Sequence, residues 1–132
     1  TRAWAVDGSP ADCVRLGIWL LGDDKPDFVL SGVNNGPNRG CAILYSGTVS
    51  AAMEGSLCGI PAAAVSLCTF NDREYETAAR MGVQLMEWAA EHPLPRGEIY
   101  NLKQTTLAVW LSCLLMALFL QMLKKDTLQD WF

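Results

Sequence analysis

Apolar residues along the first hundred positions follow two alternating patterns, one with helical spacing and one of short continuous runs. Continuous apolar runs are typical of strands buried in a parallel sheet, and amphipathic stripes are typical of helices that lie on one. In chain order, the pattern predicts a helix over 10–21, a strand over 28–30, a helix over 47–58, a strand over 60–67 and a helix ending near 91. This alternation indicates an α/β fold with a parallel sheet and crossover helices.

Polar residues mark where the three helices begin. Ser9 and Asp12 form a capping pair at the first helix, and Ser46 is placed to cap the second. Asn71 and Glu74 form a capping-box pattern before the third helix. Each predicted helix therefore has a defined start.

The helices differ in how much apolar surface they carry. In the first helix, apolar residues wrap around most of the circumference, so we expect it to be well covered by other parts of the protein. The third helix is amphipathic, and its predicted inner face consists of Tyr75, Ala78, Ala79, Gly82, Val83, Met86 and Ala90.

The stretch 31–40 contains almost no residue that a core could use, and it follows a predicted strand. We therefore expect a loop at the carboxyl end of that strand. Open α/β sheets bind ligands outside the carboxyl ends of their strands, so 31–48 is the segment where a ligand is expected.

Beyond residue 102 the sequence changes character. From 106 to 123 the only polar side chains are Thr106, Ser112 and Gln121, and this length is at the lower limit for crossing a membrane. Three interpretations stay open for 106–123: a helix buried against a partner chain, which we favour, a membrane helix, or a tail created by a deletion or frameshift. We accordingly divide the chain into a core over 1–102 and an apolar helical tail over 103–132.

Composition narrows the functional classes. The net charge of −4 and the pI of about 4.8 provide no diffuse attraction for polymeric nucleic acid. The five cysteines form no CxxC pair, which argues against a disulfide framework or a structural zinc and favours reduced thiols in the cytoplasm. The first residues lack the pattern of a signal peptide and an initiator Met, so we expect the chain to begin within a longer protein.

Two short segments carry candidate chemistry. Asn34, Asn35 and Asn38 place three carboxamides within five positions, and such groups can bind a divalent cation or a phosphate. Ser46, Gly47 and Thr48 at a helix start form a candidate phosphate cradle. Taken separately, each segment has a simpler interpretation, as turn formers in the first case and an ordinary helix cap in the second.

Taken together, the two segments carry a resemblance to a known family. Gly8 to Val14, Pro26 to Gly40, Tyr45 to Gly55, and Gly59 to Ser66 closely resemble the SurE family, over about residues 3–91 and, with the run Ile99 to Leu102, through residue 102. The resemblance implies a Rossmann-like, three-layer α/β core, here truncated. It also implies a divalent-metal-dependent 5'/3'-nucleotidase, a phosphatase of nucleoside monophosphates, that forms a homodimer or higher oligomer.

Carried over position by position, the resemblance assigns a role to five residues. Asn34 becomes a ligand of Mg²⁺ or Mn²⁺, and Asn38, Ser46, Gly47 and Thr48 lie around the phosphate. The resemblance identifies no catalytic base or nucleophile in this chain. The sequence also does not indicate which nucleobase or which phosphate position of the substrate is preferred.

The sequence departs from the family in ways that bear on activity. The family's metal site includes an Asn-Asp-Asp-Gly motif and a serine on a following loop, and the 132 residues contain no counterpart of either. Asp23 and Asp24 precede a strand instead of following one, so we interpret them as a solvated turn, and Lys103-Gln104-Thr105 replaces the family's strand ending. We therefore expect little or no phosphatase activity from this chain alone. The alternative is a non-catalytic remnant that binds phosphate or nucleotide, or that only oligomerises.

Overall fold

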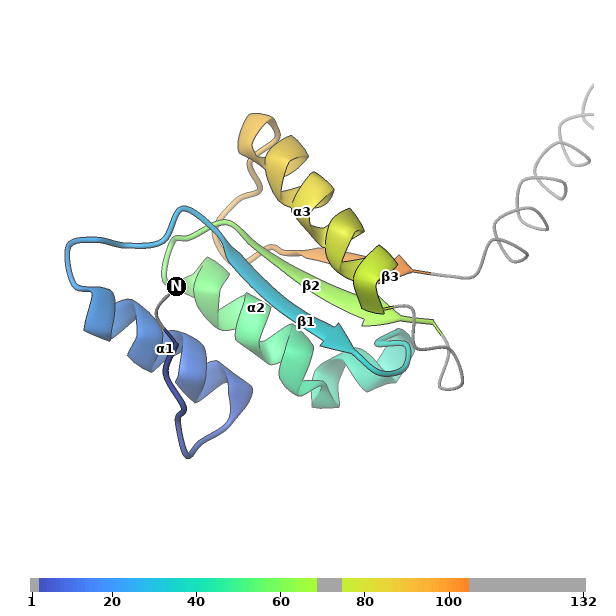
Figure 1. The fold of residues 1–132 in the computed structure, drawn as a ribbon, viewed down its shortest axis with the longest axis horizontal. Helices are drawn as coiled ribbons and strands as arrows, with labels where there is room; N and C mark the ends of the chain where they lie inside the picture. The colour runs from blue at the N-terminus through green and yellow to red at the C-terminus, as the bar shows by residue number, and fades with distance from the viewer. Residues whose placement is uncertain (1–2, 69–74, 105–132) are drawn as a thin grey trace, which may run out of the picture.

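The computed structural model describes residues 3–68 and 75–104, which form a small α/β unit (Figure 1). Its elements in chain order are α1 (Pro10–Leu21), β1 (Val29–Asn34), the 3-10 helix η1 (Gly40–Tyr45), α2 (Gly47–Leu57), β2 (Ala62–Leu67), α3 (Tyr75–Glu91) and β3 (Tyr100–Gln104). The predicted fold class is confirmed, as are the predicted helices over 10–21 and 47–58 within one residue.

The three strands form one parallel sheet in the order β1-β2-β3. Val29 pairs with Ala62 at the start of β1, and Leu67 pairs with Gln104 at the end of β3. The register between β1 and β2 shifts between Ser31 and Asn34. Because all strands run the same way, their carboxyl ends lie at one edge of the sheet, with the segment 35–46 beside them (Figure 1).

Helices α2 and α3 cover opposite faces of the sheet (Figure 1). Gly55 of α2 lies against Val29, whereas Gly82 of α3 lies against Leu30 and Val65. Neighbouring residues of a strand point to opposite faces, so the two helices lie on different sides. The connections β1–α2–β2 and β2–α3–β3 move in the same direction across the sheet but pass over opposite faces. The two crossovers therefore have opposite handedness, and one of them departs from the right-handed rule for parallel strands.

Strand β2 is the centre of the core. All six of its residues are buried, because it is paired on both edges and covered on both faces. On the α2 side, Ala62 and Ala64 pack with Val49 and Ala52. On the α3 side, Val65 and Leu67 pack with Ala78. The small side chains let both helices approach the sheet closely.

The first helix differs from its prediction. The capping pair is confirmed, because the Ser9 hydroxyl and backbone N–H both donate to Asp12 Oδ2 (2.6 and 2.9 Å) and Asp12 N–H donates back to Ser9 Oγ (3.3 Å). The expected cover is not observed: α1 has no buried residue, and the Trp19 side chain is 73% exposed. Among the described elements, the extensive packing of α1 is with α2, where Arg15 Nε donates to Glu54 Oε1 (2.7 Å). One neighbouring helix cannot cover an apolar surface that extends around most of α1.

The third helix shows smaller differences from its prediction. Ala78 and Gly82 are buried as predicted, but Ala89 is buried in place of Ala90, and Ala79 and Val83 are exposed. The predicted cap at Asn71 and Glu74 lies outside the described residues.

Strand β1 continues to Asn34, four residues beyond the predicted end at Leu30, because backbone pairing with β2 does not depend on apolar side chains. A Cβ at Gly32, whose φ is 125°, would collide with the Val65 carbonyl oxygen, so this strand extension requires glycine. The helix η1 was not predicted.

Strand β3 includes Lys103 and Gln104, so the division between 102 and 103 suggested by the sequence falls within a strand. Asp23 and Asp24 are exposed, as expected for a solvated turn. No helix within 3–68 and 75–104 is long and apolar enough to cross a membrane. The apolar segment 106–123 lies outside the described residues, and its three interpretations stay predictions.

The close approach of α2 to β1 predicts opposite effects of alanine at two helical glycines. In Gly55→Ala, the new Cβ would lie 2.8 Å from Val29 Cβ, and we expect the free energy of unfolding to fall by about 1–2 kcal/mol. In Gly17→Ala, the new Cβ meets nothing within 4 Å, and we expect a rise of about 0.5–1 kcal/mol from helix propensity. Urea unfolding of both variants checks the pair. Equal effects at the two positions would contradict the packing described here.

The capping pair predicts a pH dependence of stability. Hydrogen bonds from Ser9 lower the pKa of Asp12 below its ordinary value of 3.8. The carboxylate therefore stabilises the folded chain above pH 3.8, and this contribution is lost as the pH falls through the lowered pKa. We expect Asp12→Asn to be less stable than the wild type at pH 7, with the difference disappearing at the acid end of a pH series. Asp27→Asn, in the exposed turn before β1, controls for the change in net charge.

Candidate functional site

The site begins at the carboxyl edge of the sheet, where β1 ends at Asn34 and α2 begins at Gly47. The two ends meet through a hydrogen bond from Thr48 Oγ1 to Asn34 Oδ1 (3.1 Å). Asn34 Nδ2 donates to the Gly36 carbonyl oxygen (2.8 Å), which fixes the plane of the carboxamide. The structure therefore brings together the two segments that the sequence singles out separately.

Ser46 and Gly47 have clear structural tasks at the start of α2. Ser46 Oγ accepts a hydrogen bond from Val49 N–H (3.1 Å), as an ordinary N-cap does. A Cβ at Gly47 would lie 2.9 Å from Pro10 Cγ, so α1 leaves room only for glycine at this position. The cap satisfies one of the free N–H groups of the first turn, and the positive end of the helix dipole lies at Ser46 and Gly47.

Asn38 lies deeper in the protein than Asn34. It is 7% exposed, and its Nδ2 donates to Ser66 Oγ of β2 (2.9 Å). Its backbone carbonyl accepts a hydrogen bond from Asn101 Nδ2 of β3 (3.3 Å). The carboxamide nitrogen carries two hydrogens, so the bond to Ser66 leaves a second donor for a ligand.

Sequence reasoning missed Ser66 and Asn101 as parts of this region. Ser66 is fully buried within an otherwise apolar strand, and this polar position in an apolar run was a usable signal. The Asn101 side chain lies across the sheet from Asn34, and no local pattern relates the two residues. The Oδ1 atom of Asn101 is buried and has no hydrogen-bond partner.

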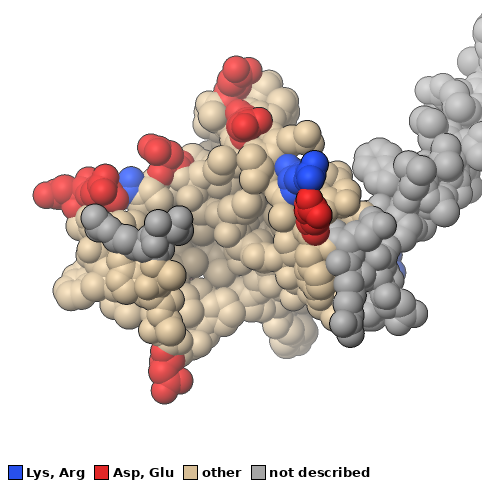
Figure 2. Space-filling view, in the orientation of Figure 1, with Lys and Arg blue, Asp and Glu red and all other residues tan. Residues whose placement is uncertain are grey.

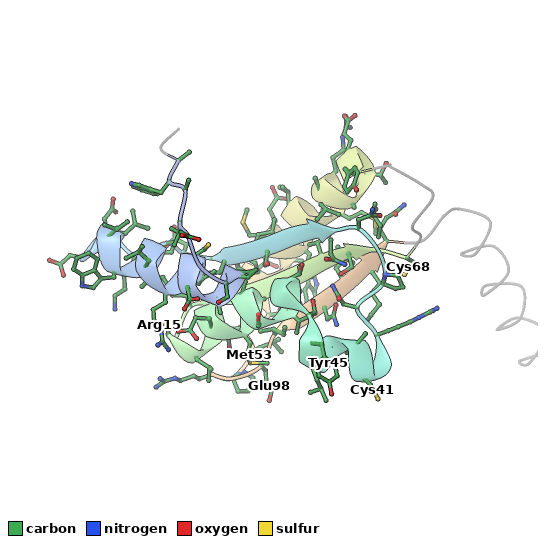
Figure 3. The ribbon with its side chains drawn as sticks, turned by 90° about the horizontal axis from the view of Figure 1, so that it is seen from below. Arg15, Cys41, Tyr45, Met53, Cys68 and Glu98 are labelled. Carbon is green, nitrogen blue, oxygen red and sulfur yellow. The ribbon has the colours of Figure 1, made fainter. Side chains whose placement is uncertain are left out.

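The outer side of the site carries exposed residues of several kinds, including Arg39 next to Asn38. Cys41 and Tyr45 extend outward from η1 (Figure 3), and Tyr45 is 88% exposed. On the face shown in Figure 2, the acidic and basic side chains of the described residues form small separate groups and no continuous basic surface. The described cysteines are free thiols: Cys13, Cys41 and Cys58 are exposed, and Cys68 is partly buried.

The described residues fit one side of a divalent cation site. Asn34 Oδ1 is a neutral oxygen of the kind that Mg²⁺ and Mn²⁺ bind, and it already accepts the Thr48 hydroxyl. Within 3–68 and 75–104, no three His, Cys, Asp or Glu side chains come together where they could hold a metal ion. Asp23 and Asp24 belong to the turn after α1, which leads into the opposite end of β1. The residues that the structure describes do not complete a cation site by themselves.

Two cavities of the described residues lie at the other edge of the sheet. One of about 250 Å³ is bordered by the end of α2 and the segments that lead into β2 and β3, including Ser56, Arg96 and Tyr100. Another of about 520 Å³ lies between Phe28, Pro61 and Met86. The polar side chains around Asn34 converge at the carboxyl edge, so the chemistry of the side chains, and not the size of a cavity, identifies the candidate site.

Comparisons with known proteins identify the family of the chain. The family model described as "Survival protein SurE" matches residues 1–108. A 5'-nucleotidase SurE of Trichormus variabilis is 53% identical over 94 residues, which cover 71% of this chain and 36% of that protein. A 5'-nucleotidase SurE of Carboxydothermus hydrogenoformans is 52% identical over 103 residues, covering 76% and 39%.

A solved structure supports the same relationship. The crystal structure of the SurE protein from Aquifex aeolicus matches with a TM-score of 0.70 and 42% identity, over 76% of this chain and 41% of that one. The chain thus spans little more than a third of the length of the curated relatives described above. The resemblance seen in the sequence is confirmed by the family match and the structural match. This chain belongs to the SurE family.

Proposed function

We propose that 31–48 forms the phosphate-facing part of a nucleotidase site, which hydrolyses nucleoside monophosphates to nucleoside and phosphate. The observation that carries the proposal is the hydrogen bond between Thr48 Oγ1 and Asn34 Oδ1 at the start of α2 (3.1 Å). The names of the relatives, 5'-nucleotidase SurE, support the reaction class.

In this proposal the start of α2 binds the phosphate. The first turn of a helix has backbone N–H groups without partners inside the helix, and its dipole favours a negative charge. Gly47 and Thr48 contribute such N–H groups, with Ser46 placing the turn through its cap. Asn38 contributes its second amide hydrogen from the other side of the loop. These neutral donors stabilise the phosphate charge through hydrogen bonds.

Asn34 provides the link to a divalent cation. Its Oδ1 is proposed as one ligand of Mg²⁺ or Mn²⁺, which when bound supplies positive charge next to the phosphate. Thr48 and Gly36 orient the carboxamide, so that Oδ1 is held in place before any ion arrives. One neutral oxygen holds a cation weakly in competition with water, and carboxylates from outside this cluster are needed for firm binding.

The activity of the chain alone follows from this incomplete donor set. We expect a molecule that binds phosphate or a nucleoside monophosphate weakly and turns over little or none of it. For the isolated chain, the rival proposal of a non-catalytic remnant also predicts no turnover. Its form that only oligomerises differs in predicting no binding of phosphate or nucleotide. The oligomer that the resemblance implies, and the cytoplasmic location that the cysteine pattern favours, stay predictions.

Turnover is tested with the purified 132-residue chain, a series of nucleoside monophosphates and Mn²⁺, with phosphate release as the readout. We expect release at or near the rate without protein. Release that is well above this background and disappears in Asn34→Ala would show that the chain carries a working site, contrary to this expectation.

Binding is tested by calorimetric titration with inorganic phosphate and with AMP, each with and without Mn²⁺. Thr48→Val removes the hydroxyl at nearly constant volume, and we expect phosphate affinity to fall about five- to tenfold and stability to fall by about 1 kcal/mol. Thr48→Ser keeps the hydroxyl and is expected to bind like the wild type. If the wild type binds neither ligand, or if Thr48→Val binds as well as Thr48→Ser, the proposed phosphate cradle is wrong.

A further inference from the structure

The segment 35–39 crosses the carboxyl ends of the strands from β1 toward β3. It leaves β1 after Asn34, and Asn38 is bound both to β2, through Ser66, and to β3, through Asn101. Gly36, within the segment, has a φ of 108°, and Gly40, which follows it, has a φ of 57°, so the backbone here includes two residues with wide conformational freedom. Its shape therefore depends on contacts made by side chains outside it.

The contact with β2 is buried. Asn38 is 7% exposed and Ser66 is fully buried, and their hydrogen bond is 2.9 Å long. Removing the Ser66 hydroxyl would leave a buried amide donor without that acceptor, and an unmet donor is costly away from water. The favoured position of Asn38 is thus set by a residue of the central strand.

The contact with β3 is made at a cost. Asn101 Nδ2 donates to the Asn38 carbonyl oxygen, while Asn101 Oδ1 is buried without a partner. An apolar side chain of the same size would avoid the unpaired oxygen, so stability alone does not account for an asparagine here. What an apolar side chain could not do is hold the Asn38 carbonyl.

We propose that Ser66 and Asn101 are positioning residues, which hold 35–39 in the shape that binds phosphate. The inference rests on the proposed function of 31–48, and neither residue contacts the ligand. Thr48 fixes one end of the segment through Asn34, and Ser66 and Asn101 fix the middle through Asn38. A segment held in its binding shape loses less conformational freedom when a ligand arrives, which strengthens binding.

The sharpest test is Asn101→Leu in the full chain. It removes the bond to Asn38 together with the unpaired oxygen, so we expect thermal stability equal to or above that of the wild type. We expect amide hydrogen exchange in 35–39 to accelerate about tenfold and phosphate affinity to fall about fivefold. A purely structural role would not lower affinity while stability is kept. Wild-type exchange and affinity in Asn101→Leu would overturn the role of Asn101.

Ser66→Ala tests the second anchor, with Ser56→Ala as its matched control. Ser56 is also a buried serine, and its hydroxyl donates to the Glu98 carbonyl oxygen (2.7 Å) and accepts from Gly97 N–H (2.9 Å) at the opposite edge of the sheet. We expect exchange in 35–39, measured relative to the amides of β2, to rise about tenfold in Ser66→Ala and to stay unchanged in Ser56→Ala. Equal effects of the two substitutions on 35–39 would overturn the role of Ser66.

A double-mutant cycle separates this proposal from the one it rests on. Asn38→Ala and Ser66→Ala remove opposite partners of one bond, so their effects on phosphate affinity should be less than additive if Ser66 acts through Asn38. Additive effects would overturn the proposal. If the wild type binds neither inorganic phosphate nor AMP, the proposed function fails, and accelerated exchange of 35–39 in Asn101→Leu still decides whether the segment is held by β3.

Discussion

Parallel pairing on both sides of β2 is the constraint on which the rest of this structure depends. Because β1 and β3 both run parallel to β2, every strand ends at the same edge, and every connection must cross a face of the sheet to begin the next strand. The segment 35–39, the start of α2 and the ends of β2 and β3 are therefore neighbours, although they are far apart along the chain. A parallel sheet supplies the site's location before any side chain is considered.

Small side chains in the core allow the helices to pack closely on this parallel sheet. Strand β2 contains three consecutive alanines, and glycines of α2 and α3 lie directly on β1 and β2. Close approach buries the strands where their side chains are small, and it leaves little tolerance for added volume at Gly55. Close packing also restrains the residues beneath the candidate site. Ser66 belongs to β2, which is covered on both faces, and Asn101 belongs to β3, which is paired with β2.

The polar contacts at the carboxyl edge show how stability and function are divided. Thr48, Asn34, Asn38 and Ser66 satisfy one another, whereas Asn101 keeps one buried oxygen unpaired. Buried polar groups that are only partly satisfied reduce stability, and in our proposal their presence at the carboxyl edge is explained by the shape they impose on the backbone. The structure therefore separates two kinds of residues: those proposed to touch a phosphate and those proposed to hold the ones that do.

The sequence by itself determined the fold class, the limits of α1 and α2, and the two segments around Asn34 and Ser46. These features depend on local signals, namely apolar spacing, a capping pair and glycines next to hydroxyls, which remain readable without the rest of the chain. The tertiary structure decided the extension of β1 to Asn34, because backbone pairing with β2 continues where apolar side chains stop. It also left α1 exposed, since among the described elements its extensive packing is with α2 alone. The pairing of Asn38 with Ser66 and Asn101 could be found only in the folded chain, because hydrogen bonds between residues 28 and 63 positions apart leave no periodic trace in the sequence.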